Sequence, residues 1–597
     1  MRFARFSAAL ALALCTALPV AAADKDKTDK PHNVLVFVAD GLRYVSVTPQ
    51  SAPTLWKLKS EGVDFTNSHS LYPTITTVNA SAIATGHYIG DTGNFGNVIY
   101  TGFPIAGAKD APITFQEDDA LLGELTAHYN GNYLNETSLI AAAREAGYAT
   151  AIMGKVGPTA IQDITQRDGK GTIVIDDALN TPKGILVAPE INDAIKAAGL
   201  PLTAPKTNVP NNEQQKYMMA LATKVVLPKL ASSGHPFAMV FWSRDPDASQ
   251  HSQKDSLGKL TPGINGPTGR AGIKDADETL AALLAALKAQ GLDKTTDVFV
   301  TADHGFSTID RHSQTSAAGK ITYGRVPPGE TPPGVVAIDL ADALGLPLTD
   351  PFLRKPVDYK NGELPSYGMG FLGIDPANPD IVVIANGGSD HIYLPAANAK
   401  DLAPKIADIL SREDYISGIF VNDDLGHVPG ALPMSAVNLH GAALTPHPAM
   451  IVSFASHVIP GCKPTLMCAA EMADTTLETG QGMHGTFSRA DTLNFMAAIG
   501  PDFKKRFADP APVSNADINP TLARILGLDI PAKGILKGRT ATEALRGGKP
   551  VSVTRGWQAS MPAPNGQKTV LDYQRVGGTR YFDAAGFPGR TVGLSPH

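Results

Sequence analysis

Six aspartate and histidine residues stand either just beyond an apolar, strand-like run or between glycines. They are Asp40, Asp247, His251, Asp303, His304 and His484. Carboxylate oxygen and imidazole nitrogen are ligands that zinc takes in proteins. Six such ligands divide into two sets of three, and each set would leave a coordination position open for a substrate oxygen. The pattern therefore predicts a catalytic site for two metal ions.

Each of these positions also has a simpler interpretation. An Asp-His pair after a strand is often a turn, and the spacing of Asp247 and His251 also suits an ordinary hydrogen-bonded pair. The carboxyl ends of strands, however, meet at one edge of an open α/β sheet, where ligands bind. Three strand ends of this kind, together with a histidine flanked by glycines, favour the metal site.

A cluster of hydroxyl groups supplies a candidate nucleophile. Thr74, Thr76 and Thr77 precede the small-residue run 80–86, which can begin a helix. A hydroxyl at a helix N-terminus lies beside free backbone N–H groups and the positive end of the helix dipole, which is a suitable place for a phosphate. Because a free threonine hydroxyl is a poor nucleophile, it needs a base or a metal to activate it. From these residues alone, the three threonines are equal candidates.

The hydroxyl cluster resembles part of a known family. It is similar to the nucleophile segment of nucleotide pyrophosphatase/phosphodiesterases of the alkaline phosphatase superfamily, with the pattern Tyr72-Pro73-Thr74-x-Thr76-x-x-Asn79 followed by Thr85-Gly86. Four further motifs occur in the family's order: Asp40-Gly41, Pro246-Asp247-x-x-x-His251, Asp303-His304-Gly305 and Gly482-x-His484-Gly485. The resemblance thus runs from residue 34 to about residue 487, nearly the whole mature chain.

The resemblance implies a role for each of these residues. Thr76 would be the nucleophile and would form a covalent phospho-threonine. It would be bound to a first zinc ion, whose protein ligands are Asp40, Asp303 and His304. A second zinc ion would be held by Asp247, His251 and His484, although other divalent metals could take either place. The family also has an asparagine 21 residues after the nucleophile that donates to a phosphoryl oxygen, and Asn97 occupies this position here.

Departures from the family pattern leave the identity of the ester open. Val78 and Ala80 replace a proline and a histidine near the nucleophile, and Thr92-Gly93 replaces His-Gly, so nucleotide specificity is not implied. Lys155 follows another apolar run and is a candidate substrate-binding cation. Threonine-dependent phosphomonoesterases of the superfamily carry Lys-x-Arg in this region, but Gly157 stands in place of the arginine. A solvated lysine at the end of a strand is the alternative.

We therefore expect a phosphoric ester hydrolase with a small phosphate ester as its substrate. A phosphodiesterase/nucleotide pyrophosphatase is the first choice, ahead of an alkaline phosphatase (phosphomonoesterase) and a phosphonate hydrolase of the same fold. The segment around Thr76 lacks the Cys/Ser-x-Pro-x-Arg pattern of sulfatases. The non-enzymatic alternative is an inactive extracytoplasmic binding protein, which would be expected to have lost a metal ligand or the hydroxyl, whereas all seven residues are present.

Apolar runs alternate with helical patterns along the chain. Strand-like runs occupy residues 34–38, 150–153, 237–242, 298–301 and 381–384, and helical patterns occupy 138–146, 275–290 and 401–410. This alternation predicts a doubly wound, mainly parallel α/β sheet, which the resemblance makes alkaline phosphatase-like. The expected parts are a catalytic domain in 24–310 and 433–550, an inserted cap subdomain in 311–432, a smaller loop-like insertion in 98–136, and a C-terminal β-like tail with an edge hairpin in 551–597.

The N-terminus and the composition bear on location and partners. Two arginines, an apolar stretch at 8–20 and three alanines ending at Ala23 predict a cleaved signal peptide, and hence a periplasmic or secreted protein without a stable membrane anchor. The net charge of −6 and the lack of a dense Lys/Arg run speak against binding to a nucleic-acid polymer. In an oxidising compartment, Cys462 and Cys468 are expected to form a disulfide, the alternative being two unpaired buried thiols. The oligomeric state is left open.

Overall fold

Strand β1 (Asn33–Ala39) forms the buried centre of the main sheet in the computed structural model, which describes residues 32–597. Its successive side chains enter two different hydrophobic clusters, because Val34 and Val36 face one side of the sheet and Leu35 faces the other. A strand covered on both faces needs an apolar side chain at every position, which explains its uninterrupted apolar run. The predicted signal peptide lies outside the described residues.

The main sheet has eight strands in the order β22-β2-β21-β9-β1-β8-β6-β7. Besides β1, they are β2 (Val63–Phe65), β6 (Ala149–Gly154), β7 (Ile173–Asp176), β8 (Phe237–Ser243), β9 (Thr296–Thr301), β21 (Met496–Ile499) and β22 (Phe507–Asp509). The five neighbours from β9 to β7 are parallel, whereas β21 runs antiparallel to β9. The α/β class and the mainly parallel sheet are therefore confirmed.

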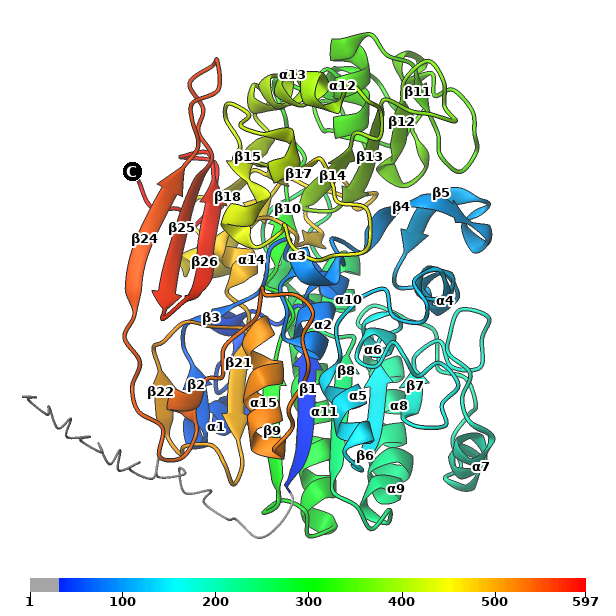
Figure 1. Ribbon diagram of the computed structural model, residues 1–597, viewed down its shortest axis with the longest axis vertical. Helices are drawn as coiled ribbons and strands as arrows, with labels where there is room; N and C mark the ends of the chain where they lie inside the picture. Colours follow the sequence, from blue (N-terminus) through cyan, green and yellow to red (C-terminus); the bar gives the residue numbers. More distant parts are fainter. Residues whose placement is uncertain (1–31) are drawn as a thin grey trace, which may run out of the picture. The chain divides into compact units, whose positions relative to one another are not determined.

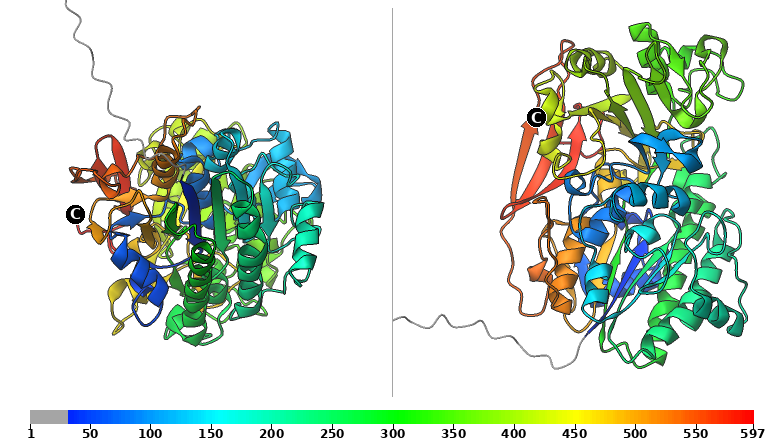
Figure 2. Two further views of the ribbon diagram at one scale, coloured as in Figure 1. Left: turned by 90° about the horizontal axis from the view of Figure 1, so that it is seen from below. Right: turned by 45° about the vertical axis from the view of Figure 1, so that its right-hand side comes forward.

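Helices pack against both faces of this sheet (Figures 1 and 2). One face carries α2 (Thr76–Thr85), α5 (Leu139–Glu145), α6 (Pro158–Ile161) and α15 (Ile518–Leu526). The other carries α1 (Pro53–Glu61), α7 (Pro189–Ala197), α8 (Asn212–Leu221), α9 (Leu227–Ala231) and α11 (Pro267–Ala289). Two of the predicted helices are α5 and α11, and the latter begins eight residues earlier than predicted because Pro267 can start a helix. No helix within residues 32–597 is both long enough and apolar enough to cross a membrane.

A second sheet of seven strands lies beyond the carboxyl end of β1, as Figure 1 shows. In sheet order its strands are β11 (Leu348–Thr349), β12 (Gly370–Leu372), β13 (Ile381–Asn386), β14 (Ser389–Tyr393), β17 (Met450–Phe454), β15 (Ile416–Val421) and β16 (Leu432–Pro433). Helices α12 (Val335–Leu344) and α13 (Ala399–Ser411) share its hydrophobic cluster. Because β17 pairs with both β14 and β15, the sheet extends past the predicted boundary at residue 432. The role of this segment as a cap stays a prediction.

Two further segments differ from the sequence-based expectation. The insertion at 98–136, predicted to be loop-like, contains the antiparallel pair β4 (Val98–Ile105) and β5 (Ala111–Phe115) and helix α4 (Asp119–His128). The tail after residue 551 forms a separate antiparallel sheet of three strands instead of an edge hairpin. Its strands are β24 (Thr554–Ala559), β25 (Val570–Val576) and β26 (Thr579–Gly586). Both regions use antiparallel neighbours close in sequence, which need only short connections.

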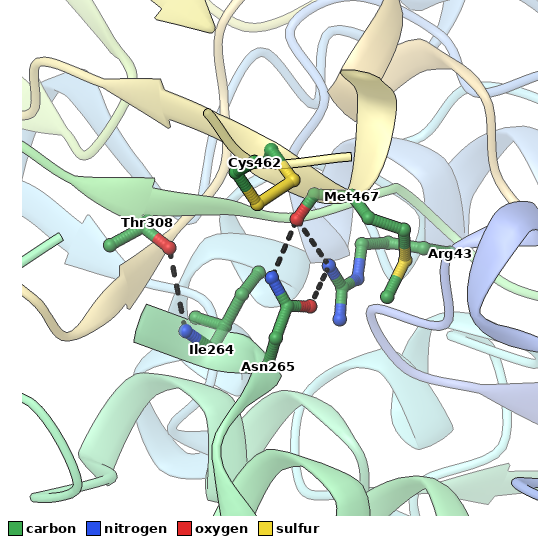
Figure 3. The surroundings of a disulfide bond; sticks show 7 residues. Arg43, Ile264, Asn265, Thr308, Cys462 and Met467 are labelled. Atoms are coloured by element: carbon green, nitrogen blue, oxygen red, sulfur yellow. Dashed lines mark hydrogen bonds between the residues drawn. A yellow bond between two sulfur atoms is a disulfide. The ribbon is translucent and has the colours of Figure 1, made fainter. Parts of the chain in front are cut away.

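The expected disulfide joins Cys462 and Cys468 (Figure 3). The carbonyl oxygen of Met467, next to it, accepts hydrogen bonds from the Asn265 side chain at 2.6 Å and from the Arg43 guanidinium at 3.5 Å. Arg43 is buried and lies three residues after Asp40. The disulfide loop is therefore tied to the segment that leaves the central strand.

Candidate metal and phosphate site

Three carboxylates reach one site from neighbouring strands of the main sheet. Asp40 directly follows β1, Asp303 lies two residues beyond β9, and Asp247 opens helix α10 (Asp247–Ser252) after β8. Because β9, β1 and β8 are adjacent and parallel, their carboxyl ends lie side by side. All three side chains are buried. The strand ends thus assemble the acidic half of the predicted site.

His484 joins the carboxylates through a short strand pairing. β20 (Gly482–Met483) runs antiparallel to β10 (Ser307–Ile309), which follows the loop that carries His304. The rings of His484 and His304 stack with their centroids 3.5 Å apart. The third histidine, His251, lies one turn after the first residue of α10 and therefore faces the same side of that helix. A segment far along the chain thereby completes the site.

All three imidazole rings present the same nitrogen to the centre of the site. In each ring Nδ1–H donates to a backbone carbonyl oxygen 2.8 Å away: His251 to Gly482, His304 to Gly305 and His484 to Thr74. A bond of this kind fixes the orientation and the tautomer of metal-binding histidines. The lone pair of Nε2 is consequently directed inward in each ring.

Each of the three carboxylates keeps one buried oxygen without a hydrogen-bond partner. These oxygens are Asp40 Oδ1, Asp247 Oδ1 and Asp303 Oδ2. His304 Nε2 lies 3.6 Å from the Asp40 oxygen and 3.2 Å from the Asp303 oxygen. The Asp247 oxygen lies 3.1 Å from His251 Nε2 and 3.6 Å from His484 Nε2. Because a buried, unpaired carboxylate oxygen is costly, the arrangement suits cations held between these atoms.

The ligand atoms form two overlapping groups, each with all its atoms within 4.8 Å of one another. They are Asp40, Asp303 and His304, and Asp247, His304 and His484. The first group is the predicted first set of ligands. The second has His304 where His251 was predicted, although His251 contacts the same Asp247 oxygen. All six predicted ligands therefore meet, with His304 shared between the groups.

The electrostatics of the site reflect this crowding of charges. Burial and a neighbouring carboxylate raise the pKa of Asp40 well above its usual range. Burial alone would raise the pKa of Asp247 as well, but the cations around it, Lys155 above all, hold that pKa well below its usual range. Burial lowers the pKa of His484. For His304, the nearby carboxylates outweigh burial and raise the pKa to about 9. A proton on Nε2 of His304 would therefore compete with a metal ion for that nitrogen.

The structure separates the three threonines that the sequence left equivalent. The hydroxyl of Thr74 donates to the carbonyl oxygen of Thr486 at 2.8 Å, and that of Thr77 donates to the carbonyl oxygen of Gly96 at 3.0 Å. Thr76 is the first residue of α2, and its Oγ1 lies 3.2 Å from His304 Nε2. Of the three hydroxyls, Thr76 therefore faces the metal-binding atoms, at the N-terminus of a helix.

Lys155 contacts this hydroxyl, and Asn97 contacts the backbone of the next residue. Lys155 Nζ is buried and lies 3.4 Å from Thr76 Oγ1, so it is not a solvated lysine. The side-chain oxygen of Asn97 accepts the backbone N–H of Thr77 at 3.0 Å, which leaves its NH2 group directed away from the helix. Lys155 therefore places a donor beside Thr76, and Asn97 holds the first turn of the helix that Thr76 begins.

Three residues around the site were missed by the sequence analysis. Glu117 lies 3.0 Å from Lys155 Nζ, and Trp242 donates its indole N–H to Asp40 Oδ2 at 2.7 Å. Asn386 makes two hydrogen bonds to the backbone of Val98, next to Asn97. Trp242 could have been found, because it ends the apolar run before Asp247. Glu117 and Asn386 come from elements outside the main sheet and carry no motif.

Comparison with known proteins agrees with this geometry. Residues 34–321 match the family model of type I phosphodiesterase / nucleotide pyrophosphatase. This family is a member of the alkaline phosphatase superfamily. The matched family consists of hydrolases that act on phosphodiester bonds. A search of curated proteins found no match.

The matched segment contains most of the site. It includes the three carboxylates, Thr76 and two of the histidines, but His484 lies beyond its end at residue 321. His484 and the second sheet are therefore connected to the matched segment by structure alone, through the β10–β20 pairing and the contacts of Asn386.

Proposed function

We propose that the protein is an exported phosphodiesterase of the nucleotide pyrophosphatase type, with Thr76 as its nucleophile and two zinc ions as cofactors. The observation that carries the proposal is the position of Thr76 Oγ1. It is the one threonine hydroxyl of its cluster that faces the inward nitrogen of His304, while its neighbours bond to backbone carbonyls. The family match supports a phosphodiester as the substrate class.

The residues present fit two divalent cations. Asp40, Asp303 and His304 would hold one ion, and Asp247 and His484, with His251 beside them, would hold the other. Three unpaired carboxylate oxygens and three inward Nε2 atoms supply the six donors. Such a pair of ions polarises the phosphoryl group and stabilises charge on the attacking and leaving oxygens.

The reaction proposed for this site has two displacements. Thr76 Oγ1 attacks phosphorus, the bond to the leaving-group oxygen breaks, and a phospho-threonine forms. A water molecule then attacks phosphorus from the vacated side and releases Thr76. The NH2 group of Asn97 and Lys155 Nζ would donate to the non-bridging oxygens, where negative charge develops, and the positive end of the α2 dipole would add to this effect.

A phosphomonoesterase is the second candidate, and Lys155 is the observation that favours it. A buried ammonium group close to the nucleophile suits a dianionic monoester, because the extra charge of that substrate needs an additional cation. The match to a phosphodiesterase family places this candidate second.

The test compares Thr76→Ala with the wild-type protein. We expect Thr76→Ala to keep the wild-type zinc content and Tm and to lose hydrolysis of bis(p-nitrophenyl) phosphate, because only the nucleophilic oxygen is removed. Thr85→Ala is the matched control, since it makes the same change at the far end of α2, where the hydroxyl donates to the carbonyl oxygen of Ser81. Residual Thr76→Ala activity within tenfold of wild type would place the nucleophile elsewhere. A wild-type protein with less than one zinc per chain and no turnover of aryl phosphates would be the inactive binding protein.

A further inference from the structure

Glu117 stands at the position where the proposed phosphate-binding donors converge. It follows β5 and precedes α4, in the insertion at 98–136. Its Oε1 lies 3.0 Å from Lys155 Nζ and accepts a hydrogen bond from the Asn97 NH2 group at 3.4 Å. These are the two side chains proposed to donate to phosphoryl oxygens. A carboxylate oxygen therefore competes with the substrate for the same donors.

The remaining contacts of Lys155 show how its charge is distributed. Lys155 Nζ lies 3.1 Å from Asp40 Oδ2 and 3.1 Å from Asp247 Oδ2, the oxygens that do not face the histidines. Metal-facing oxygens and lysine-facing oxygens are thus different atoms, so the lysine and the cations can bind together. Three carboxylates contact Lys155 Nζ, and Glu117 is the one that is not a proposed metal ligand. Its negative charge can therefore offset the positive charge of Lys155 where the substrate would bind.

The surroundings of Gly157 show why no arginine occupies this position. A Cβ atom at this position would lie 2.5 Å from the carbonyl oxygen of Gln116 and 2.7 Å from Glu117 Cα, and the backbone has φ +88°. No side chain fits there, because the segment that carries Glu117 packs directly against Gly157. The arginine of a Lys-x-Arg pair therefore cannot occupy position 157, and the carboxylate of Glu117 contacts Lys155 instead.

A further cation near Lys155, Arg244, does not restore the missing charge. Arg244 donates to Asp177 Oδ1 at 3.0 Å and also contacts the second oxygen of that carboxylate. A bidentate pair of this kind leaves little of the arginine charge unpaired. Apart from the proposed cations and their ligands, Lys155 and Glu117 are therefore the charged side chains that a substrate would meet beside Thr76.

We propose that Glu117 is a specificity-determining residue that selects monoanionic phosphodiesters over dianionic phosphomonoesters. This inference rests on the proposed function of the site. With Glu117 ionised, the Lys155–Glu117 pair is neutral and offers no additional attraction to the second charge of a monoester. A carboxylate within a few ångströms of the phosphoryl oxygens would repel a dianion about twice as strongly as a monoanion, and Glu117, with a side chain 15% exposed beside a buried lysine, is only partly screened by solvent.

The experiment replaces the charge of Glu117 and keeps its shape. Glu117→Gln retains an oxygen that can accept from Lys155, so the lysine keeps its place. We expect kcat/KM for p-nitrophenyl phosphate to rise about tenfold or more relative to kcat/KM for bis(p-nitrophenyl) phosphate, a change of about 1.4 kcal/mol in relative barrier. Calorimetric titration of the zinc-loaded protein with inorganic phosphate should show about tenfold tighter binding.

A matched control and two outcomes make the test decisive. Glu124→Gln is the same substitution in the same insertion, where the carboxylate accepts the backbone N–H groups of Ala106 and Gly107 and contacts neither Lys155 nor Asn97. A substrate ratio and a phosphate affinity within threefold of wild type, at equal zinc content and Tm, would overturn the proposal. Equal loss on both substrates would also overturn it, since Glu117 would then only position Lys155. If Glu117→Gln is unstable, Glu117→Ala is measured in the same way.

Failure of the proposed function is recognised separately. It would appear in the wild-type protein as turnover that does not depend on Thr76, or as no turnover at all. The phosphate titration does not depend on catalysis, so it still reports whether Glu117 opposes a dianion at this site.

Discussion

Replacement of Asn386 by alanine tests whether the second sheet positions the phosphate site. Asn386 ends β13 and is 6% exposed. Its side-chain oxygen accepts the backbone N–H of Val98 at 3.0 Å, and its NH2 group donates to the carbonyl oxygen of Val98 at 2.9 Å. Val98 directly follows Asn97. The two bonds therefore fix the backbone from which the proposed phosphoryl donor projects.

The expected magnitudes follow from these two bonds. Asn386→Ala leaves one N–H and one carbonyl group of Val98 buried and unpaired, and each such group costs about 1–3 kcal/mol of stability. We expect Tm to fall by several degrees. Complete loss of a positioned donor to a developing oxyanion costs about 10²–10³ in rate. Because Asn97 would be displaced and not removed, we expect kcat/KM for bis(p-nitrophenyl) phosphate to fall about 10–100-fold.

The assay combines diester hydrolysis, thermal unfolding and zinc content. Zinc should stay at the wild-type level, since Asn386 contacts none of the six predicted ligands by hydrogen bond. Asn422→Ala is the control, because Asn422 is a similarly buried asparagine after β15 whose side chain accepts the N–H of Asp424. Activity of Asn386→Ala within threefold of wild type, despite a lower Tm, would refute the positioning role and leave Asn386 a purely structural residue.

Two further predictions concern pH. Burial and the charge of Asp502 raise the pKa of Asp297 to about 8, so the folded state favours the protonated form, and the stability that this group contributes is lost as pH rises toward 8. Asp297→Asn should therefore raise Tm at pH 8 by more than at pH 5, and an equal shift at both values would contradict the assignment. The pKa of His304 is raised to about 9, chiefly by Asp303 against the effect of burial, so a proton competes for its Nε2 below that pH. Zinc retained against a fixed chelator should fall as pH drops from 9 to 6, and pH-independent retention would show that His304 binds no metal.

Four strands of the main sheet, β1, β6, β8 and β9, could be predicted because each is a continuous apolar run in the sequence, whereas the other four were not predicted. β1 and β8 are buried on both faces, and an uninterrupted apolar run is the direct consequence. β4 could not be found in this way, because Gly102 and Pro104 interrupt it and mimic a loop. The boundary of the second sheet was missed for another reason. β17 lies beyond the predicted boundary at residue 432, but it pairs with β14 and β15, which lie before that boundary.

The same distinction applies to the site. Residues at strand ends, such as Asp40 and Lys155, could be predicted to converge because parallel strands end at one edge. The choice of Thr76 among its neighbours rested on family resemblance until the hydrogen bonds of Thr74 and Thr77 separated them. Glu117 could not be predicted at all, since its place beside Lys155 depends on how a hairpin packs against a glycine.

The turn between β13 and β14 connects both sides of the proposed site. The N–H of Gly388 donates to the carbonyl oxygen of the metal-facing His484 at 2.9 Å, while Asn386 holds Val98 beside Asn97. A Cβ atom at position 388 would lie 2.5 Å from the backbone nitrogen of Thr486, so only glycine allows this approach. The segment from 311 to 432, which the sequence analysis separated as an insertion, therefore supports one proposed metal ligand and the proposed phosphoryl donor together. Removing it would withdraw contacts from the proposed catalytic site itself, whether or not the segment also covers that site.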